Sequence, residues 1–258
     1  MVEESYIELK NVCKQYVGRD NPISVLHDFS LNVSKSKVLG IYGPNGCGKT
    51  TILGIVAGFL THDKGEVLLE GNPIVTGQVG CLFQNYSASL FPWLTISDNI
   101  SFSMILKGIS RAERKDKVRY ITESLGININ IDKYPYQLSG GQQQLVSLAR
   151  ALCDSPKALV MDEPFSSLDA STRASVRSDT MKIVDSLNIT AVIVSHNLED
   201  CIACSDNIVF LSSSLPTRIF NVSEVNMEGV KAERRIHSDI FAEIMDDLEK
   251  TALAARDA

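Results

Sequence analysis

The chain has 258 residues, with 25 Lys and Arg against 31 Asp and Glu, and a formal net charge of −6 at pH 7. This length allows one large domain or two small ones around a real hydrophobic core. The acidic balance disfavours a protein that coats nucleic acid through a broad basic face, so we expect no nucleic-acid partner. Residues 1–5 are acidic and lack the apolar segment of a signal peptide, and no apolar run is long enough to span a membrane. We therefore expect a cytosolic protein unless a partner carries it to a membrane.

Six cysteines are scattered along the chain instead of forming a disulfide framework, and we expect all of them to be reduced. Cys201 and Cys204 have the spacing of a redox pair or half of a metal site. They follow a helix-like stretch, and no second Cys/His pair lies nearby. This context favours ordinary helix packing.

The first third of the chain predicts an antiparallel sheet. Residues 6–12 alternate in patches, 29–34 alternate cleanly between apolar and polar, and 66–70 precede a Gly-Asn-Pro turn. Half-exposed strands of this kind are typical of antiparallel pairing. Short continuous apolar runs instead predict strands of a parallel sheet that is covered on both faces. These runs are 38–41, 79–83, 158–161 and 191–194.

Residues 95–125 are predicted to be mostly helical. Ser110 and Glu113 have capping-box spacing, and Gly126 is placed as the residue after the helix end. A further helix is predicted from Asp169, as its cap, to about Leu187.

Leu145, Leu148, Ala149 and Leu152 predict another helix by their spacing. An amphipathic pattern over 240–248 predicts a helix near the end of the chain, followed by frayed residues at 251–258. We expect one domain over 1–220, with a helical subdomain at about 90–155, and a C-terminal extension over 221–258.

Residues 37–51 join an apolar strand to a helix through a glycine-rich loop. Gly43, four further residues and then Gly48-Lys49-Thr50 match the P-loop pattern, in which backbone N–H groups surround a phosphate. Lys49 would reach the β- and γ-phosphates, and the Thr50 hydroxyl would bind Mg²⁺. A turn that carries a lysine by chance is the alternative, which the flanking strand and helix disfavour. The loop residues expected at the phosphates are Gly43, Pro44, Asn45, Gly46, Cys47, Gly48, Lys49, Thr50 and Thr51.

Two side chains in this region carry further expectations. Cys47 lies at a helix N-terminus, where the positive end of the dipole favours a thiolate, so we expect it to be alkylated and to be protected by nucleotide. Phe59 follows Ile52, Ile55 and Val56 at helical spacing, so we expect all four on one core-facing side of the helix.

Asp162 and Glu163 follow the apolar run 158–161, at the strand end where ligands bind in open α/β sheets. Asp162 would hold Mg²⁺ directly or through water, and Glu163 would orient and deprotonate the water that attacks the γ-phosphate. A solvated carboxylate pair is the alternative. The P-loop in the same chain favours the catalytic interpretation.

A second glycine-rich loop, 138–142, reads Leu-Ser-Gly-Gly-Gln and opens a helix that could present N–H groups to phosphate. It has no lysine of its own. Because Lys49 already accounts for the γ-phosphate of one nucleotide, we infer that this loop completes the site of another copy of the chain. The pentapeptide resembles the signature of ATP-binding-cassette (ABC) ATPases and stands in that family's order, between the P-loop and Asp162. The signature residues expected at the nucleotide are Ser139, Gly140, Gly141 and Gln142.

The resemblance implies an α/β P-loop NTPase fold: a core with a mostly parallel sheet, an antiparallel β subdomain and a helical insertion. It also implies roles for residues that would mean little alone. Tyr16 would stack on adenine, Gln84 would contact Mg²⁺ and the attacking water, and Asp169 would lie at the dimer interface. His196 would contact the γ-phosphate. The expected catalytic residues are Glu163, His196, Gln84 and Lys49, and the expected Mg²⁺ ligands are Thr50, Gln84 and Asp162.

Two segments resemble the nitrate/sulfonate/taurine class of bacterial importers: 91–95, with its Phe91-Pro92-Trp93, and more loosely 211–219. A packing corner is the other interpretation of the aromatic segment, and an exposed docking surface for a permease is the one we test. The chain departs from many relatives at Gln143 and Leu145, where those proteins carry arginines, so salt bridges assumed for the family are not expected here.

The resemblance implies an ATP-binding and ATP-hydrolysing importer subunit. Two copies would form a head-to-tail dimer around two shared ATP sites, at the cytoplasmic face of the membrane, and would drive separate permease subunits and indirectly a solute-binding protein. A soluble ABC ATPase acting on nucleic acid or ribosomes is the alternative. The single unit and the short stretch between Lys49 and Leu138 disfavour it. The transported solute would never touch this subunit, so its sequence does not name that solute.

Overall fold

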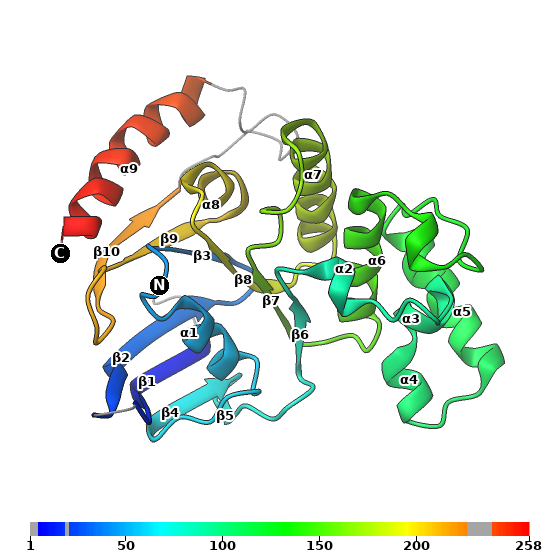
Figure 1. Ribbon diagram of the computed structural model, residues 1–258, viewed down its shortest axis with the longest axis horizontal. Coiled ribbons are helices and arrows are strands. Elements are labelled where there is room, and N and C mark those ends of the chain that lie inside the picture. Colours follow the sequence, from blue (N-terminus) through cyan, green and yellow to red (C-terminus); the bar gives the residue numbers. More distant parts are fainter. Residues whose placement is uncertain (1–4, 19–20, 226–238, 258) are drawn as a thin grey trace.

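The computed structural model describes residues 5–18, 21–225 and 239–257. Within them the chain forms an α/β fold with two sheets (Figure 1). A four-stranded sheet has the order β2-β1-β4-β5, and a six-stranded sheet has the order β10-β9-β3-β8-β7-β6. The predicted fold class is confirmed.

The four-stranded sheet is antiparallel, as the alternating segments predict. Along its edge strand, Phe29, Leu31 and Val33 are buried while the residues between them are exposed. This alternation places one side of the sheet against the core. Its strands are β1 (Ser5–Tyr16), β2 (Ile23–Ser34), β4 (Lys64–Leu69) and β5 (Asn72–Pro73).

The six-stranded sheet is parallel except for β10, which pairs antiparallel with β9. Its central strands are continuous apolar runs because both faces of the sheet are covered. In the register, Tyr42 lies opposite Ser195, and Asp162 lies opposite Val194. The residues that follow three neighbouring strands therefore meet at one sheet edge. The strands are β3 (Val38–Tyr42), β6 (Val79–Leu82), β7 (Ala158–Asp162), β8 (Thr190–Ser195), β9 (Asn207–Leu211) and β10 (Ile219–Glu224).

Helix α1 (Lys49–Val56) is buried between the two sheets and shares one hydrophobic cluster with both. The expectation that Phe59 continues its core face is wrong. The helix ends at Val56 and Gly58 takes a positive φ of 74°, which only glycine adopts without strain. The chain turns there, and Phe59 lies 58% exposed, with its ring stacked on Phe83.

The opposite face of the six-stranded sheet is covered by α7 (Ala170–Ser186), α8 (Leu198–Cys204) and α9 (Asp239–Asp257), together with part of α6 (Gly140–Leu152). Asp169 is the N-cap of α7 and Leu187 is its C-cap, as the sequence predicts. In α8, Cys201 and Cys204 are buried, and burial raises the pKa of Cys201 well above its usual value. None of the six cysteines forms a disulfide, and all six lie in the described ranges, so the packing interpretation holds.

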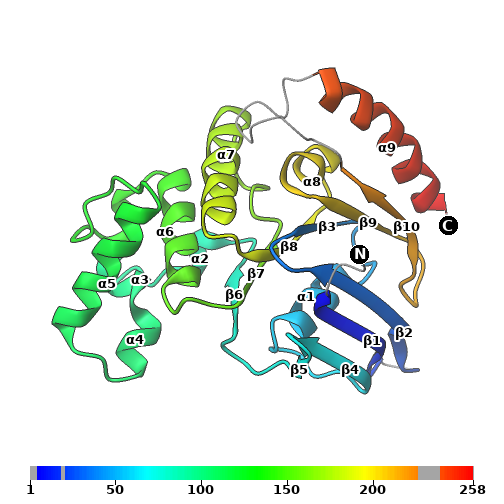
Figure 2. The same ribbon diagram turned by 180° about the vertical axis from the view of Figure 1, so that it is seen from behind.

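A group of helices forms a separate hydrophobic cluster on the side of the molecule away from α9 (Figures 1 and 2). The predicted capping box at Ser110 and Glu113 is present at the start of α5, and Gly126 has a positive φ of 61° after its end. The helical insertion expected between the P-loop and Asp162 is therefore confirmed. Its elements are α2 (Tyr86–Ser89), α3 (Ile96–Ile100), α4 (Phe102–Leu106), α5 (Arg111–Ser124), the 3₁₀ turn η1 (Pro135–Gln137) and α6 (Gly140–Leu152).

The C-terminal helix α9 continues through the residues expected to be frayed. Phe241, Leu248, Ala252 and Ala255 are buried against α8, β9 and β10, because alanines at helical spacing let the helix pack closely on the hydrophobic cluster there. The expectation of fraying over 251–257 is wrong, and residue 258 lies outside the described residues, as does the side chain of Ile240.

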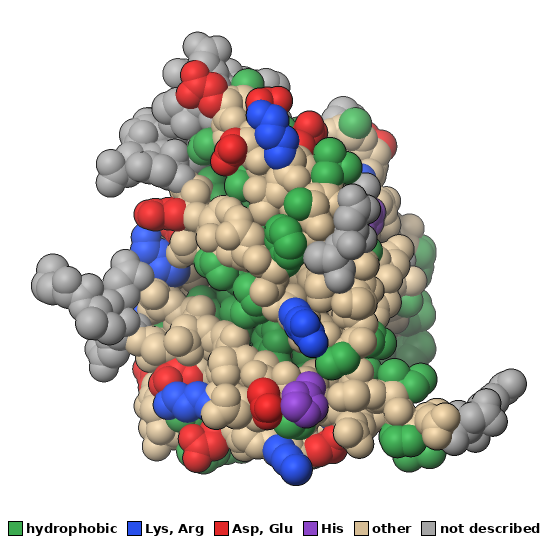
Figure 3. Space-filling model, turned by 90° about the vertical axis from the view of Figure 1, so that its left-hand side faces the viewer, with side chains coloured by type: hydrophobic (Ala, Val, Ile, Leu, Met, Phe, Trp, Pro, Cys, Tyr) green, Lys and Arg blue, Asp and Glu red, His purple; other side chains and the backbone are tan. Residues whose placement is uncertain are grey.

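Figure 3 views the face that carries α9 and β10, where hydrophobic side chains show in the middle and most of the charged ones lie toward the upper end, the lower end and one side. The strand β10 crosses the boundary placed at residue 220, and that division of the chain stays a prediction. Over the described ranges, no helix combines the length and the apolar composition needed to cross a bilayer.

Candidate active site

A cavity of about 320 Å³ lies at the sheet edge where β3, β7 and β8 end. Polar residues from four separate parts of the chain meet in it: the P-loop, the segment after β6, and the ends of β7 and β8. The predicted catalytic residues all line this cavity, as do the predicted Mg²⁺ ligands. The lining residues are Val25, Asn45, Gly46, Gly48, Lys49, Thr50, Thr51, Gln84, Asp162, Glu163 and His196.

The P-loop leaves the first turn of α1 open toward the cavity. Gly48 is the N-cap residue with a φ of 96°, and no side chain caps the helix there. The first N–H groups of a helix have no partner within the helix, and their partial positive charge favours an anion. An uncapped helix start beside a cavity can therefore bind phosphate.

Lys49 is buried, and its Nζ donates to the carbonyl oxygens of Gly43 and Pro44 at 2.7 and 2.8 Å. Its cation is thus held across the loop by neutral acceptors. A phosphate that enters the cavity meets a positive charge that no carboxylate of the described residues contacts directly. This arrangement favours binding of a highly charged anion such as a nucleoside triphosphate.

Cys47 does not face the cavity. Its side chain is fully buried in the cluster around α1, and burial raises the pKa of its thiol while Lys49 acts in the opposite direction. The expectation of a reactive thiolate is therefore wrong, because the desolvation of the buried sulfur outweighs the helix N-terminus. In the folded chain we expect little alkylation of Cys47 with or without nucleotide, and only its backbone is available to a phosphate.

The two carboxylates at the end of β7, Asp162 and Glu163, differ in their surroundings. Burial raises the pKa of Asp162, the neighbouring Glu163 raises it further, and Lys49 lowers it. Glu163 has a positive φ of 47°, and its carboxylate is held by His196. The backbone N–H of His196 donates to Glu163 Oε1 at 2.9 Å, and His196 Nδ1 lies 2.7 Å from Glu163 Oε2. The Glu163 carboxylate and the His196 side chain thus hold each other in position.

The sequence placed Glu163 and His196 at one edge but did not predict their direct contact. The register explains it, because Asp162 of β7 pairs with Val194 of the adjacent parallel strand β8. Glu163 therefore lies one residue beyond this pair, and His196 lies two residues beyond it. The His196 side chain is 55% exposed while that of Glu163 is 8% exposed. Histidine can therefore meet a ligand in the cavity while it fixes the carboxylate behind it.

The oxygen donors in the cavity suit a magnesium ion. Thr50, Gln84 and Asp162 supply a hydroxyl, an amide and a carboxylate, and Mg²⁺ prefers oxygen ligands, with the remaining positions taken by water and substrate phosphates. A single protein carboxylate is in keeping with this pattern.

Tyr16 lies beside the cavity without lining it. Its hydroxyl is 3.3 Å from Thr51 Oγ1 at the start of α1, and its ring is 39% exposed, with Lys14 Nζ 5.5 Å from the ring centroid. An exposed ring next to the phosphate loop is available for stacking on a base.

The signature loop lies outside this cavity. Ser139 is the N-cap of α6, its hydroxyl accepts from the Gln142 N–H, and Gln142 Oε1 accepts from the Ser139 N–H. Asp169 likewise caps α7 by accepting from the Thr172 N–H. A Cβ on Gly141 would lie 2.9 Å from Val176, so this glycine permits close packing of α6 on α7. The structure therefore brings the P-loop, Gln84, Asp162, Glu163 and His196 together, and leaves the residues 139–142 and 169 apart from them.

Two residues near the cavity were not predicted from the sequence to belong to the site. Val25 lines it from β2, and Thr217 donates its hydroxyl to the carbonyl of Cys47 from beneath the P-loop. Neither residue carries chemistry that a sequence pattern identifies. Only the fold shows that they reach the loop.

Comparison with known proteins agrees with this geometry. The family model described as ABC transporter matches residues 26–166, which is more than half of the chain. The chain belongs to the ABC transporter family. It is an ATP-binding ABC protein that hydrolyses ATP, as its sequence predicted.

The uncharacterised ABC transporter ATP-binding protein MJ0412 of Methanocaldococcus jannaschii is 36% identical over 224 residues, which cover 86% of this chain and 83% of that protein. The nitrate import ATP-binding protein NrtC of Synechococcus elongatus is 35% identical over 205 residues, 78% of this chain but 31% of the relative. This chain thus spans about a third of the nitrate import protein.

The solved dimeric structure of the ATP-binding cassette MJ0796, bound to ADP and Pi, has a TM-score of 0.72 to this chain and is 26% identical. The match covers 85% of this chain and 99% of the cassette. The α/β architecture described above is therefore that of an ABC ATPase cassette.

Proposed function

We propose that this chain is the ATP-hydrolysing subunit of an ABC importer, working as a head-to-tail dimer with two shared ATP sites and driving separate permease subunits. The observation that carries the proposal is the single cavity in which Lys49, Gln84, Asp162, Glu163 and His196 meet. One edge of the sheet thus supplies a phosphate cradle, oxygen ligands and a positioned base, which are the parts that ATP hydrolysis needs.

Within this site the residues divide the work. Lys49 and the open N–H groups of α1 bind the β- and γ-phosphates, while Thr50, Gln84 and Asp162 would hold Mg²⁺, which would neutralise phosphate charge. Glu163 takes the proton from the attacking water. His196, already bonded to Glu163, keeps that carboxylate in place and reaches the γ-phosphate from its exposed side.

A second copy completes the site through its signature loop. The loop 138–142 and Asp169 lie away from the cavity of their own chain, yet Ser139, Gly140 and Gly141 stand at a helix N-terminus suited to phosphate. Support comes from the dimeric form in which the related cassette MJ0796 was solved with ADP and Pi.

Import is supported by the nitrate import relative and by the resemblance of 91–95 to the nitrate/sulfonate/taurine class. The proposed partners are membrane permease subunits and, through them, a solute-binding protein, so that the chain works at the cytoplasmic face of the membrane. The alternative, a soluble ABC ATPase acting on nucleic acid or ribosomes, is less well supported because the chain is acidic.

Hydrolysis is tested by Glu163→Gln in the purified chain with Mg²⁺ and ATP. The amide keeps the size of the side chain and an oxygen that can accept from the His196 N–H, but it cannot take a proton from water. We expect the turnover rate to fall by about 10²- to 10⁴-fold, with ATP affinity near that of the wild type. A variant that hydrolyses ATP at the wild-type rate would remove Glu163 as the base.

Coupling to a permease is tested at Trp93. Its side chain is 70% exposed, and its ring lies 5.6 Å from that of Phe91, which in turn packs on Phe102 at 4.4 Å. Phe91 is therefore the anchored member of the pair, and Trp93 is the side chain offered to a partner. Trp93→Ala should lower transport by the complete transporter and leave ATP hydrolysis by the isolated subunit near normal. Equal loss of both, with loss of fold, would show that Trp93 is a packing residue.

A further inference from the structure

The loop 212–218, between β9 and β10, lies beneath the P-loop. It is closed by two hydrogen bonds: the Ser212 N–H donates to the Arg218 carbonyl at 3.0 Å, and the Arg218 N–H donates to Ser212 Oγ at 3.2 Å. Leu211, just before it, packs against the start of the P-loop, because a Cβ on Gly43 would lie 3.1 Å from the Leu211 Cβ. The segment that resembled an importer class thus touches the phosphate loop.

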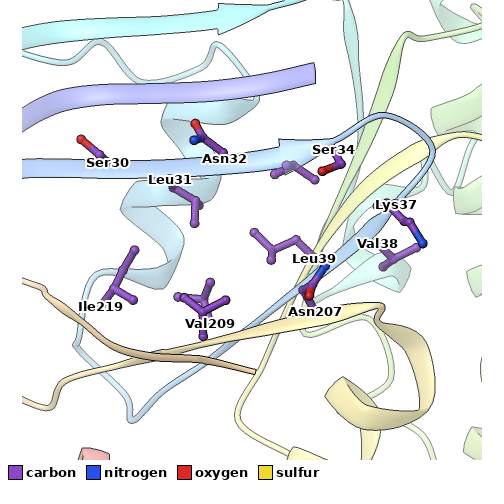
Figure 4. Close-up of a pocket in the computed structure, with 12 residues that line it drawn as sticks. Ser30, Leu31, Asn32, Ser34, Lys37, Val38, Leu39, Asn207, Val209 and Ile219 are labelled. Carbon is purple, nitrogen blue, oxygen red and sulfur yellow. The ribbon is translucent and has the colours of Figure 1, made fainter. Parts of the chain in front are cut away.

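The hairpin of β9 and β10 meets β2 at the end nearest the P-loop. A cavity of about 390 Å³ lies between these strands, with Leu31, Leu39, Val209 and Ile219 pointing into it (Figure 4). Beyond that cavity the Thr217 N–H donates to the Val25 carbonyl at 2.8 Å, in a bridge next to Leu26. This backbone hydrogen bond to β2 therefore fixes the position of Thr217 next to the P-loop.

The Thr217 hydroxyl donates to the carbonyl oxygen of Cys47 at 2.6 Å. Thr217 is 2% exposed, so this bond is shielded from water. The contact is close: a Cβ on Gly48 would lie 2.5 Å from Thr217 Oγ1. The backbone of the P-loop rests directly on this hydroxyl.

The consequence follows from the planarity of the peptide bond. In a trans peptide unit the carbonyl and the following N–H point in opposite directions. Holding the Cys47 carbonyl on the side of Thr217 therefore directs the Gly48 N–H to the other side. Gly48 lines the cavity, so that side is the phosphate site.

We propose that Thr217 is a positioning residue for the nucleotide, which orients the Gly48 N–H toward the phosphates by holding the Cys47 carbonyl. The inference rests on the proposed nucleotide site. A donor fixed before the ligand arrives needs no reorganisation on binding, so its loss weakens phosphate binding. Thr217 touches neither nucleotide nor water in this account.

The experiment compares three variants of the full chain: Thr217→Val, which removes the hydroxyl at nearly constant shape, Thr217→Ser, which keeps it, and the control Thr122→Val. Thr122 is also buried, and its hydroxyl donates to the Val118 carbonyl at 2.9 Å, within α5. Calorimetry gives the Kd of ATP and ADP, steady-state kinetics give KM and kcat, and thermal melting reports the fold.

We expect Thr217→Val to raise the Kd of both nucleotides and the KM of ATP by about three- to tenfold, with kcat within about twofold of the wild type. Thr217→Ser should restore affinity, and Thr122→Val should melt earlier yet bind as the wild type does. If Thr217→Val does not fold, Thr217→Ala and Thr122→Ala replace the pair.

The outcomes separate the two proposals. A wild-type chain that binds no ATP overturns the proposed function. A wild type that binds ATP, with a folded Thr217→Val that binds equally well, overturns the positioning role alone. Equal weakening by Thr217→Val and Thr122→Val also overturns it, because the effect would then report general stability.

Discussion

The chain contains two glycine-rich helix starts that look alike in sequence and differ in structure. At α1, the N-cap is Gly48 and no side chain caps the helix, so its N–H groups face a cavity that also holds Lys49 and Asp162. At α6, Ser139 and Gln142 form a reciprocal capping box, and the loop lines no part of that cavity. The N-terminus of α1 is therefore open to a ligand bound in the cavity of the same chain. The N-terminus of α6 is capped by its own side chains and is available only to a ligand outside that cavity. A glycine-rich helix start therefore identifies a phosphate site only together with the groups around it.

The largest effect is expected at α1, from Lys49→Ala. The variant loses the cation and the two bonds by which Lys49 Nζ holds the Gly43 and Pro44 carbonyls. We expect the Kd of ATP to rise by about 100-fold or more, measured by calorimetry. The control is Lys107→Ala, which removes an exposed lysine paired with Asp154 in the helical part of the chain. If Lys49→Ala binds ATP as the control does, α1 is not the phosphate site.

Asp162→Asn sharpens the comparison by removing a charge from the α1 cavity. The pKa of Asp162 is raised on folding, so its ionisation costs stability as the pH rises through the folded-state pKa. Without nucleotide and Mg²⁺, the variant should therefore melt at a higher temperature than the wild type at pH 7, while Mg²⁺-dependent hydrolysis falls.

Asp63→Asn should change the melting temperature in the opposite direction to Asp162→Asn. The hydrogen bond from the Gln15 N–H lowers the pKa of Asp63 in the folded chain. The ionised carboxylate therefore stabilises the fold above the pKa that Asp63 has in the unfolded chain, and this stabilisation is lost as the pH falls through its pKa in the folded chain. The Asn variant at position 63 should therefore melt earlier at pH 7. If the melting temperatures of both variants shift in the same direction, the electrostatic difference between Asp162 and Asp63 is contradicted.

A smaller effect is expected at α6 from Ser139→Ala. Loss of the cap should lower the free energy of unfolding by about 1 kcal/mol, measured by urea denaturation. The Kd of ATP for the monomeric chain should not change, because Ser139 lies outside its own cavity. Ser110→Ala is the matched control, since Ser110 caps α5 with the same type of capping box. Weaker ATP binding by the monomer with Ser139→Ala, but not with Ser110→Ala, would place the loop in the site of its own chain.

Much of the fold was predictable because local chemistry and tertiary packing agree. Apolar runs became the buried parallel strands, and Ser110 and Asp169 became the helix caps that their positions predict. The errors came from packing that no local pattern contains. The glycine at position 58 ended α1 before Phe59, and contact with the hydrophobic cluster under α9 ordered the alanines of the C-terminal helix.

The site was predictable where chemistry is concentrated in motifs and unpredictable where it depends on burial or on distant contacts. Lys49, Asp162, Glu163 and His196 meet as expected. Cys47 failed because its side chain turns into the core, where desolvation raises its pKa. The hydroxyl of Thr217 reaches the loop from a position 170 residues further along the chain, so no sequence window could show that contact.

The shared-site account is tested most directly by Glu163→Gln with ATP, measured by size-exclusion chromatography with light scattering. Blocking hydrolysis should preserve the dimer that hydrolysis dissolves, so the variant should dimerise with ATP, while the wild type shows little dimer under turnover and none with ADP. Adding Ser139→Arg should abolish the dimer, because the new side chain occupies the space of the phosphate, whereas adding Ser110→Arg, at the cap of α5, should not. A Glu163→Gln chain that binds ATP and stays monomeric at every concentration would contradict the account.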